Sequence, residues 1–224
     1  TPIVVNDSRG FYTSRVFATY VLEGIALLAE GNNARAIEMA GLKAGMPVGP
    51  LALTDEVSLT LIAHIRKQTV ADLQAEGKTP PSHGAYPVVD KMVGELKRPG
   101  KAAGAGFYEY PQGGKKHLWE GLKTNFPEGN HLPEADMIER LMFIQVIETV
   151  RCLQEGVLRS VADANIGAIF GWGFAPFKGG TLQYVNDYGV KEFVARAKQL
   201  NHQYGERFAV PTLLEQMASE GKEF

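Results

Sequence analysis

The sequence is poor in the residue types that build redox and metal sites. It has 1 cysteine and 5 histidines among 224 residues. A lone cysteine excludes an internal disulfide framework and is typical of a reducing compartment such as the cytoplasm. Because Cys152 lies within an apolar helical pattern, we interpret it as a buried structural thiol. The histidines lack the paired spacing of metal ligands, so no metal site is predicted, and His117 and His131 are expected in a solvated loop.

Strong charge of one sign and long apolar runs are also missing. The chain has 23 Lys and Arg against 25 Asp and Glu, a formal net charge of -2 at pH 7. It therefore offers no basic field for nucleic acid or an anionic membrane. No apolar run approaches the roughly 20 residues that span a bilayer, and the start shows no signal-peptide pattern. Hydrophobic residues make up 45% of the chain, enough for a buried core.

The glycine-rich loops that bind nucleotides are absent as well. A dinucleotide site requires G-x-G-x-x-G between a strand and a helix, and a Walker-type loop requires Gly-Lys followed by Ser or Thr. The nearest stretches, Gly104–Gly106 and Gly171–Gly173, lack the third glycine and the βαβ context. The sequence supports no serine–histidine–aspartate constellation either. The chain is therefore predicted to have no nucleotide site of its own.

What the sequence does contain is helical periodicity, in an order that occurs twice. Apolar residues recur at helical spacing over Phe11–Leu28 and again over Glu134–Gln154. Each long helix is expected to stop at a Glu-Gly pair, Glu30–Gly31 in the first case and Glu155–Gly156 in the second. A short helix, a loop of glycine and proline, and a further helix then follow each stop.

This shared order indicates that a helical domain has been duplicated at an offset of about 125 residues, although amphipathic helices can look alike by chance. The fold is predicted to be all-α, with related helical domains at 1–110 and 134–224 and a linker at 111–133. The other predicted elements are a β-like run at Pro2–Val5 and helices at Ala34–Leu42, Pro50–Ile65, Val88–Leu96, Ser160–Phe170, Thr181–Asn186, Val190–Tyr204 and Pro211–Ser219.

Four segments carry motifs that point to a family. They are Arg9–Arg15 (RGFYTSR), Gly45–Val57 (GMPVGPLALTDEV), Gly104–Tyr110 (GAGFYEY) and Phe170–Gly180 (FGWGFAPFKGG). The first three resemble the P-G-F-x-x-N-R, G-x-P-M-G-P-x-x-L-x-D-x-V-G and G-x-G-F-Y-x-Y motifs in the carboxy-terminal domain of 3-hydroxyacyl-CoA dehydrogenases. The fourth is similar to the second copy of that domain in large multifunctional β-oxidation enzymes.

The resemblance implies the helical part of such a dehydrogenase without its Rossmann domain. That domain would precede Thr1, bind NAD and supply the catalytic histidine with its orienting glutamate, and multifunctional members add an enoyl-CoA hydratase domain further upstream. The implied reaction is NAD-dependent oxidation of a 3-hydroxyacyl-CoA to a 3-ketoacyl-CoA. This chain would close the substrate cleft and pack as a homodimer or within a β-oxidation complex. It would have no catalytic residue and no activity alone.

Ser14 is the one candidate substrate-binding residue. It matches the family's asparagine, which makes a polar contact near the reacting end of the substrate, and Arg9 replaces the family's leading proline. Serine keeps a donor and an acceptor but reaches less far. The alternative is that Ser14 bonds only to local backbone in the first helical turn. Arg15 is interpreted as a helix-start or inter-domain contact.

The remaining motif residues have structural interpretations. The glycine and proline loops could line a cleft, but tight turns between helices need such residues anyway, and we favour the turn role. One aromatic group is predicted to pack between the first domain and its neighbour: Phe107, Tyr108 and Tyr110. Another is predicted to pack in the second domain's core or at an inter-unit face: Trp172, Phe174 and Phe177.

Two further alternatives concern binding. The basic pairs Lys97–Arg98 and Lys115–Lys116 could meet the phosphates of coenzyme A or could be solvated. The whole chain could instead be a non-enzymatic helical module for dimerisation or docking. The dense family motifs favour the dehydrogenase, and the serine at position 14 favours the rival.

Overall fold

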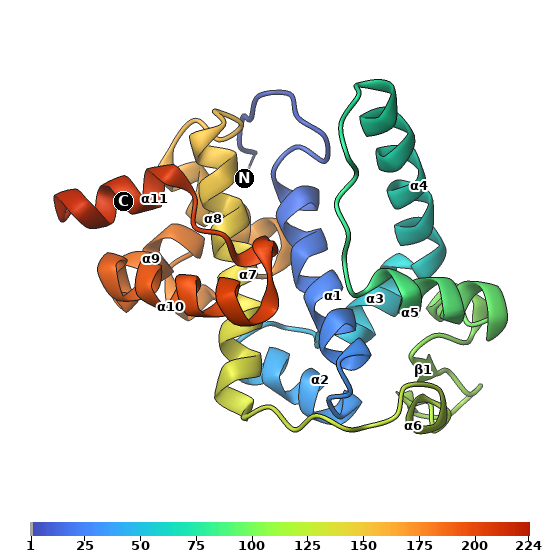
Figure 1. Cartoon of the computed structure of the whole chain (residues 1–224). Coiled ribbons are helices and arrows are strands. Elements are labelled where there is room, and N and C mark those ends of the chain that lie inside the picture. The colour runs from blue at the N-terminus through green and yellow to red at the C-terminus, as the bar shows by residue number, and fades with distance from the viewer. Residues whose placement is uncertain (1) are drawn as a thin grey trace. The chain divides into compact units, whose positions relative to one another are not determined.

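The computed structural model describes residues 2–224, and these are mainly helical, as predicted (Figure 1). The helices of the first predicted domain are α1 (Thr13–Ala29), α2 (Ala34–Lys43), α3 (Pro50–Val57), α4 (Leu59–Ala75), α5 (Tyr86–Asp90), the π-helix η1 (Lys91–Glu95) and the 3-10 turn η2 (Lys101–Ala103). Those of the second are α7 (Glu134–Gln154), α8 (Val161–Trp172), η3 (Pro176–Lys178), α9 (Thr181–Tyr188), α10 (Val190–Tyr204), η4 (Glu206–Phe208) and α11 (Thr212–Glu220). The all-α prediction is confirmed.

The predicted helix from Pro50 to Ile65 is wrong, because the chain breaks it at Ser58. Ser58 adopts a left-handed φ of 77° and ends α3. Its hydroxyl then accepts a hydrogen bond from the Thr60 N–H, and so caps the start of α4. The Leu59 N–H donates to the carbonyl of Pro99 at 2.8 Å. This partner lies far along the chain, so local periodicity could not predict the break.

Three other predicted segments differ from the structure. Residues Pro2–Val5 form no strand. The linker at 111–133 contains β2 (His117–Leu118), which pairs antiparallel with β1 (Tyr108–Glu109), and the short helix α6 (Leu122–Asn125). The helix expected at Val88–Leu96 starts earlier, at Tyr86, and changes to a π-helix after Asp90.

Contacts divide the chain into two compact units. The carboxy-terminal unit contains the chain up to Tyr20, Gly41–Pro47 and Ile138–Phe224, and the central unit contains Val21–Ala40 and Val48–Met137. The start of the first repeat is thus part of the same compact unit as most of the second. The predicted boundaries at 110 and 134 follow the repeated order of elements in the sequence, whereas the contacts group the chain differently.

The carboxy-terminal unit is built on α7, with α8, α9 and α10 around it (Figure 1). The predicted apolar face of α7 is confirmed, since Leu141, Val146 and Val150 are buried. Phe143 stacks on Phe193 of α10 with ring centroids 4.0 Å apart. Burial extends beyond the apolar face: Arg140 is fully buried and lies over the ring of Tyr204 at 4.0 Å.

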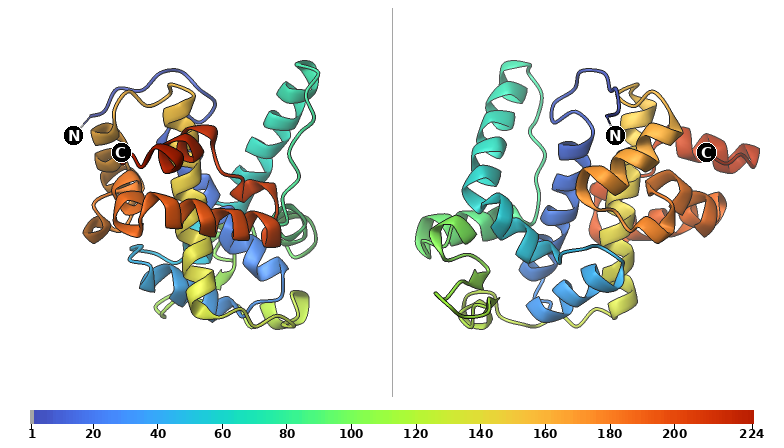
Figure 2. Two further views of the ribbon diagram at one scale, coloured as in Figure 1. Left: turned by 60° about the vertical axis from the view of Figure 1, so that its left-hand side comes forward. Right: turned by 180° about the vertical axis from the view of Figure 1, so that it is seen from behind.

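In the central unit, the helix α4 projects from the buried core. Figure 2 shows α4 extending away from the rest of this unit, with the following chain running back beside it. Of the residues of α4, only Leu59, the first one, is buried. The unit's core includes Ile25, Ile37, Leu51 and Phe107, all fully buried.

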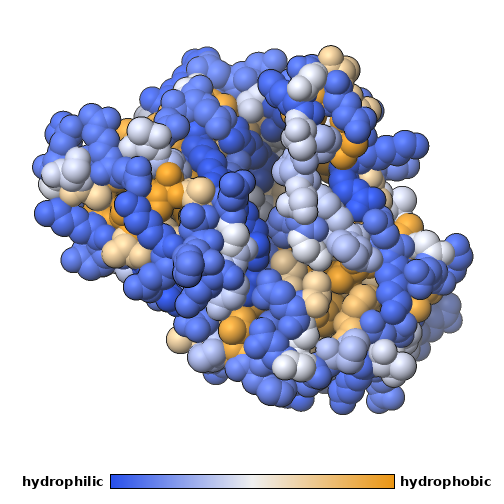
Figure 3. Space-filling model, viewed as in Figure 1, coloured by the Kyte–Doolittle hydropathy of each residue, from blue (hydrophilic) through white to orange (hydrophobic). Residues whose placement is uncertain are grey.

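On the face shown in Figure 3, apolar surface occurs in separate places. Figure 3 shows a mainly hydrophilic face with several separate apolar patches. The most exposed large apolar side chains are Phe170 and Phe177, with 74% and 72% of their surface accessible. Within residues 2–224, none of the helices combines the length and the apolar character that a membrane crossing requires.

Candidate functional site

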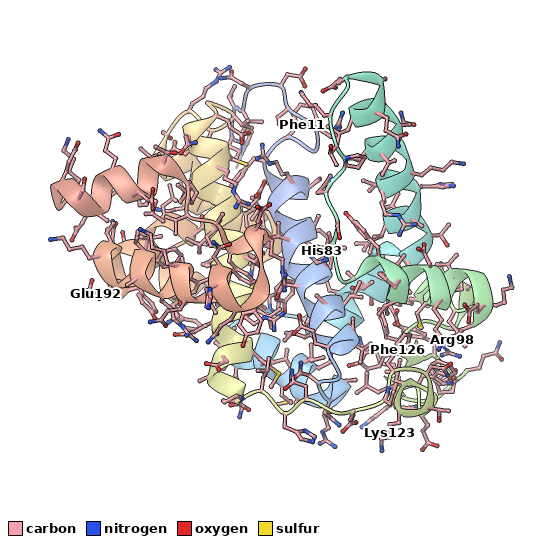
Figure 4. The ribbon with its side chains drawn as sticks, in the orientation of Figure 1. Phe11, His83, Arg98, Lys123, Phe126 and Glu192 are labelled. Carbon is pink, nitrogen blue, oxygen red and sulfur yellow. The ribbon has the colours of Figure 1, made fainter. Side chains whose placement is uncertain are left out.

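A tight turn leads into α1 and presents the candidate residue Ser14. The Phe11 N–H donates to the Ser8 carbonyl at 2.8 Å, and Gly10 has a φ of +75°. Phe11 follows with a φ of +49°, a left-handed conformation that L-residues with large side chains rarely adopt. Its ring points to solvent, with 55% of its surface exposed, at the N-terminal end of α1 (Figure 4).

Ser14 lies in the first turn of α1 and is exposed. Among the described residues, its hydroxyl makes no hydrogen bond. The alternative prediction, a hydroxyl bonded to local backbone, is therefore not what the structure has. Both the donor and the acceptor of Ser14 face outward and are available to another molecule.

The opposite side of the same turn is anchored by Tyr12 and Arg15. Tyr12 is buried, and its hydroxyl donates to the carbonyl of Ala164 at 2.8 Å. Arg15 forms ion pairs with Glu148 of α7 at 2.5 Å and with Glu155 at 2.6 Å. Arg15 was predicted to be a helix-start or inter-domain contact, and its pairing with residues of the second repeat confirms that interpretation. The sequence offered no signal for Tyr12, which stands at a variable position of the motif.

A second cluster joins two motifs that are far apart in the sequence. Asp55, at the end of the Gly45–Val57 motif, accepts hydrogen bonds from the N–H groups of Phe107 and Tyr108 at 2.8 and 2.9 Å. It also accepts one from the Tyr110 hydroxyl at 2.9 Å. A Cβ on Gly106 would lie 2.0 Å from the Asp55 carboxylate, so only glycine fits there. We call Asp55 and these partners the first latch.

The first latch corrects the prediction for the aromatic motif. Phe107 is fully buried in the central unit, and Tyr108 donates its hydroxyl to Glu38 at 2.7 Å. These residues close the first repeat on itself rather than packing it against a neighbour. Glu38 also accepts from the N–H groups of Leu51 and Ala52 at 2.7 and 3.2 Å, which caps the start of α3 from a different helix.

The second repeat has the same arrangement with amides in place of the carboxylates. Asn165 of α8 accepts from the N–H groups of Leu182 and Gln183 at 2.9 and 3.2 Å, and so caps α9. Asn186 accepts from the Phe224 N–H at 3.0 Å and donates to its carbonyl at 3.1 Å. The equivalent roles of the four residues support the predicted duplication independently of helical pattern.

The loops of glycine and proline serve this capping. A Cβ on Gly49 would lie 2.6 Å from the Glu38 carboxylate, and one on Gly180 would lie 2.4 Å from the Asn165 side chain. Each loop therefore ends in a glycine because the capping side chain occupies the space of a Cβ. The glycines of these loops are therefore explained by structure, namely tight turns between helices, as we favoured.

The carboxylates make the first repeat sensitive to pH. Burial raises the pKa of Glu38, and the hydrogen bonds from Tyr108, Leu51 and Ala52 lower it by less. A raised pKa in the folded state means that folding takes up a proton. The stabilisation is therefore complete below the ordinary carboxyl pKa and is lost as the pH rises through the raised value.

We expect Glu38→Gln to reduce this loss of stability as the pH rises above the ordinary carboxyl pKa of about 4.3. The amide oxygen can cap α3 as Asn165 caps α9, and it does not titrate. The measurement is urea unfolding at several pH values. Glu56→Gln, an exposed carboxylate on α3, is the matched control. A pH profile that stays parallel to that of the wild type would contradict the expectation.

Several other predicted residues have structural roles. Trp172 and Phe174 are buried as predicted. Phe177 is exposed and does not lie in the core, but it contacts the first repeat, which agrees with the predicted alternative of an inter-unit face. Its ring covers Gly45, where a Cβ would lie 2.4 Å away. Cys152 is fully buried, and burial raises its pKa to about 12, as suits an inert thiol. His117 and His131 are exposed, as predicted.

The basic pairs divide into one structural arginine and surface lysines. Arg98 is buried, donates to the carbonyls of Gly106 and Tyr108, and lies 4.2 Å from the Trp119 ring. Figure 4 shows it in the same part of the central unit as Phe126. Arg98 thus supports the first latch and is not available to phosphates, while Lys115 and Lys116 are exposed.

Residues 10–110 of this chain match a known protein family. They match the model described as the C-terminal domain of 3-hydroxyacyl-CoA dehydrogenase. The whole chain is 38% identical to the fatty acid oxidation complex subunit alpha of Shewanella loihica and 40% identical to that of Vibrio vulnificus. The chain spans 31% of the length of each of these relatives.

Solved structures share the fold at low sequence identity. A 3-hydroxybutyryl-CoA dehydrogenase from Escherichia coli matches 98% of this chain with a TM-score of 0.74 and 19% identity, over 62% of its own length. The dehydrogenase part of multifunctional enzyme 1 from C. elegans matches 96% with a TM-score of 0.66 and 16% identity, over 49% of its length. At these identities the likeness concerns the fold alone.

Proposed function

The chain belongs, through residues 10–110, to the family of 3-hydroxyacyl-CoA dehydrogenase C-terminal domains, and on that premise we propose that it is the helical part of a fatty-acid β-oxidation dehydrogenase. The proposed parent reaction is NAD-dependent oxidation of a 3-hydroxyacyl-CoA to a 3-ketoacyl-CoA. The identity of 38% and 40% to two fatty acid oxidation complex alpha subunits supports this assignment. We further propose that the protein acts in the cytoplasm, as a homodimer or within a β-oxidation complex.

The residues of this chain do not fit NAD themselves. A dinucleotide site needs a glycine-rich turn between a parallel strand and a helix. Within residues 2–224, the named strands are β1 and β2, which are antiparallel and two residues long. NAD and the catalytic base would therefore belong to a separate nucleotide-binding domain. The part of this chain would be to close the cleft and bind the substrate.

Ser14 carries the proposed substrate contact. It stands where the family has its asparagine, and its hydroxyl is exposed and without a hydrogen-bond partner among the described residues. A hydroxyl in this position can donate to, or accept from, an oxygen near the reacting end of the substrate. The contact orients the substrate, while the proton and hydride transfers take place on groups outside this chain.

The test is to supply the nucleotide-binding domain of the Shewanella loihica relative, fused to this chain or in trans. We expect no turnover of acetoacetyl-CoA and NADH by the chain alone, and measurable turnover by the combination. Ser14→Ala should lower kcat/KM about tenfold, since a lost hydrogen bond of about 1.4 kcal/mol corresponds to that factor. Ser14→Asn, which restores the family residue, should equal or exceed the wild type.

Ser82→Ala, which changes another exposed serine, is the control and should have no effect. Turnover by the chain alone would contradict the proposal that the base and cofactor site lie elsewhere. A combination that stays inactive but self-associates would favour the rival function, a helical dimerisation or docking module.

A further inference from the structure

Residues of the second repeat hold the chain on both sides of the turn that carries Ser14. Before the turn, the Asn6 N–H donates to the Val157 carbonyl at 2.8 Å, and the Asn6 side chain donates to the Gly156 carbonyl at 2.7 Å. Arg159 donates to the Asn6 side-chain oxygen at 2.7 Å. These bonds fix the chain on the entry side of the turn.

Beyond the turn, aromatic packing and a charge clamp hold the exit side. The Tyr12 ring meets Trp172 edge to face with centroids 5.4 Å apart, and lies against Gly167, where a Cβ would be 3.1 Å from the ring. The Arg15 guanidinium lies between two carboxylates: Nε donates to Glu148, and both terminal nitrogens donate to Glu155 at 2.6 and 3.0 Å. Bidentate pairing of this kind fixes direction as well as distance.

The turn needs such support because its backbone is strained. The left-handed φ of Phe11 is unfavourable for a residue with a large side chain and persists only where the surroundings impose it. Packing of the Phe11 ring does little to stabilise this conformation, because 55% of the residue's surface is exposed. The anchors on either side therefore maintain the conformation that faces Ser14 outward.

We propose that the second repeat is a positioning element for the substrate-binding turn of the first, and that Glu148 and Glu155, acting through Arg15, are its positioning residues. The inference rests on the proposed substrate contact of Ser14. It assigns the duplicated domain a role in substrate binding, although none of its residues need touch the substrate. A shift of the turn by about 1 Å is enough to weaken catalysis severely.

The test combines Glu148→Gln with Glu155→Gln, which removes both charges and keeps the shape of the side chains. In the full chain, hydrogen exchange is measured at the amides of Phe11 and Arg15, which bond to the carbonyls of Ser8 and Gly10. We expect exchange there to become about tenfold faster, because the turn opens more readily. The Phe193 amide of α10 should not change.

The matched control is Glu215→Gln, which removes an exposed ion pair with Lys198 in the same unit. If the double variant does not fold, Glu155→Gln alone is used, because 48% of that side chain is exposed and its loss leaves the core intact. Exchange at Phe11 and Arg15 equal to that of the control overturns the inference.

A second readout uses the chain completed with its nucleotide-binding domain. The double variant is expected to raise KM for the 3-hydroxyacyl-CoA about fivefold and to leave KM for NAD unchanged. A partly unfolded sample would change neither constant. If Ser14→Ala impairs substrate use but the double variant does not, the positioning role fails and the proposed function stands. If Ser14→Ala has no effect in an active enzyme, the proposed substrate contact itself fails.

Discussion

Replacing Asp55 with alanine is expected to lower the free energy of unfolding of the central unit by about 4 kcal/mol. The substitution leaves the N–H groups of Phe107 and Tyr108 and the Tyr110 hydroxyl without their acceptor. Phe107 is fully buried, so water cannot replace the carboxylate at its amide without opening the core. Because these bonds join two distant motifs, their loss should also release Gly104–Tyr110 from α3.

The measurement is urea unfolding followed by tryptophan fluorescence. The chain has 2 tryptophans, and Trp119 belongs to the central unit while Trp172 belongs to the carboxy-terminal unit. A Trp172→Phe background therefore reports the central unit alone. Asp55→Asn should fall between alanine and wild type, since it keeps one acceptor oxygen. The exposed neighbour substitution Glu56→Gln should cost less than about 0.5 kcal/mol. An alanine variant as stable as Glu56→Gln would show that the latch contributes no net stability.

Replacing Tyr12 with alanine is expected to destabilise the carboxy-terminal unit by about 3 to 5 kcal/mol. The ring is 1% exposed and packs against Trp172 and Gly167, so alanine would leave a cavity behind the substrate-binding turn. Loss of this anchor should also speed hydrogen exchange at Phe11. Unfolding is followed through Trp172 in a Trp119→Phe background.

Two further substitutions distinguish the contribution of the Tyr12 ring to stability from those of its hydroxyl and of the neighbouring Phe11. Tyr12→Phe removes the bond to the Ala164 carbonyl and the longer 3.5 Å hydrogen bond with the Thr181 hydroxyl, and should cost about 1 kcal/mol. Phe11→Gly removes an exposed ring from a left-handed position, and should change stability by less than about 1 kcal/mol in either direction. Equal destabilisation by Tyr12→Ala and Phe11→Gly would contradict the assignment of Tyr12 as the anchor.

The two repeats make equivalent hydrogen bonds with different side chains. Glu38 and Asn165 cap equivalent helices, and Asp55 and Asn186 hold equivalent chain segments. An amide or a carboxylate can accept these bonds, so the geometry is retained while the charge is lost. Among the described residues, the first repeat therefore makes these bonds with the carboxylates of Glu38 and Asp55, and the second makes them with amides.

The helices of this protein were determined by local sequence. A helix forms through bonds between residues four apart, so apolar spacing and stop residues predicted α7 and α10 with the bounds they have. The repeated order of elements was visible for the same reason, because each repeat carries its own stops and loops. The family resemblance likewise selected Ser14, the only proposed substrate contact in the chain.

Tertiary structure decided which residues these local elements meet. Two amphipathic helices present similar apolar faces, so spacing alone cannot tell which surface each one covers. The anchoring of Tyr12 and Arg15 by the second repeat, and the union of Asp55 with Tyr110, depend on residues more than fifty positions apart. Such bonds exist only once the chain has folded, because burial and direction, rather than sequence neighbours, select the partner of a polar group.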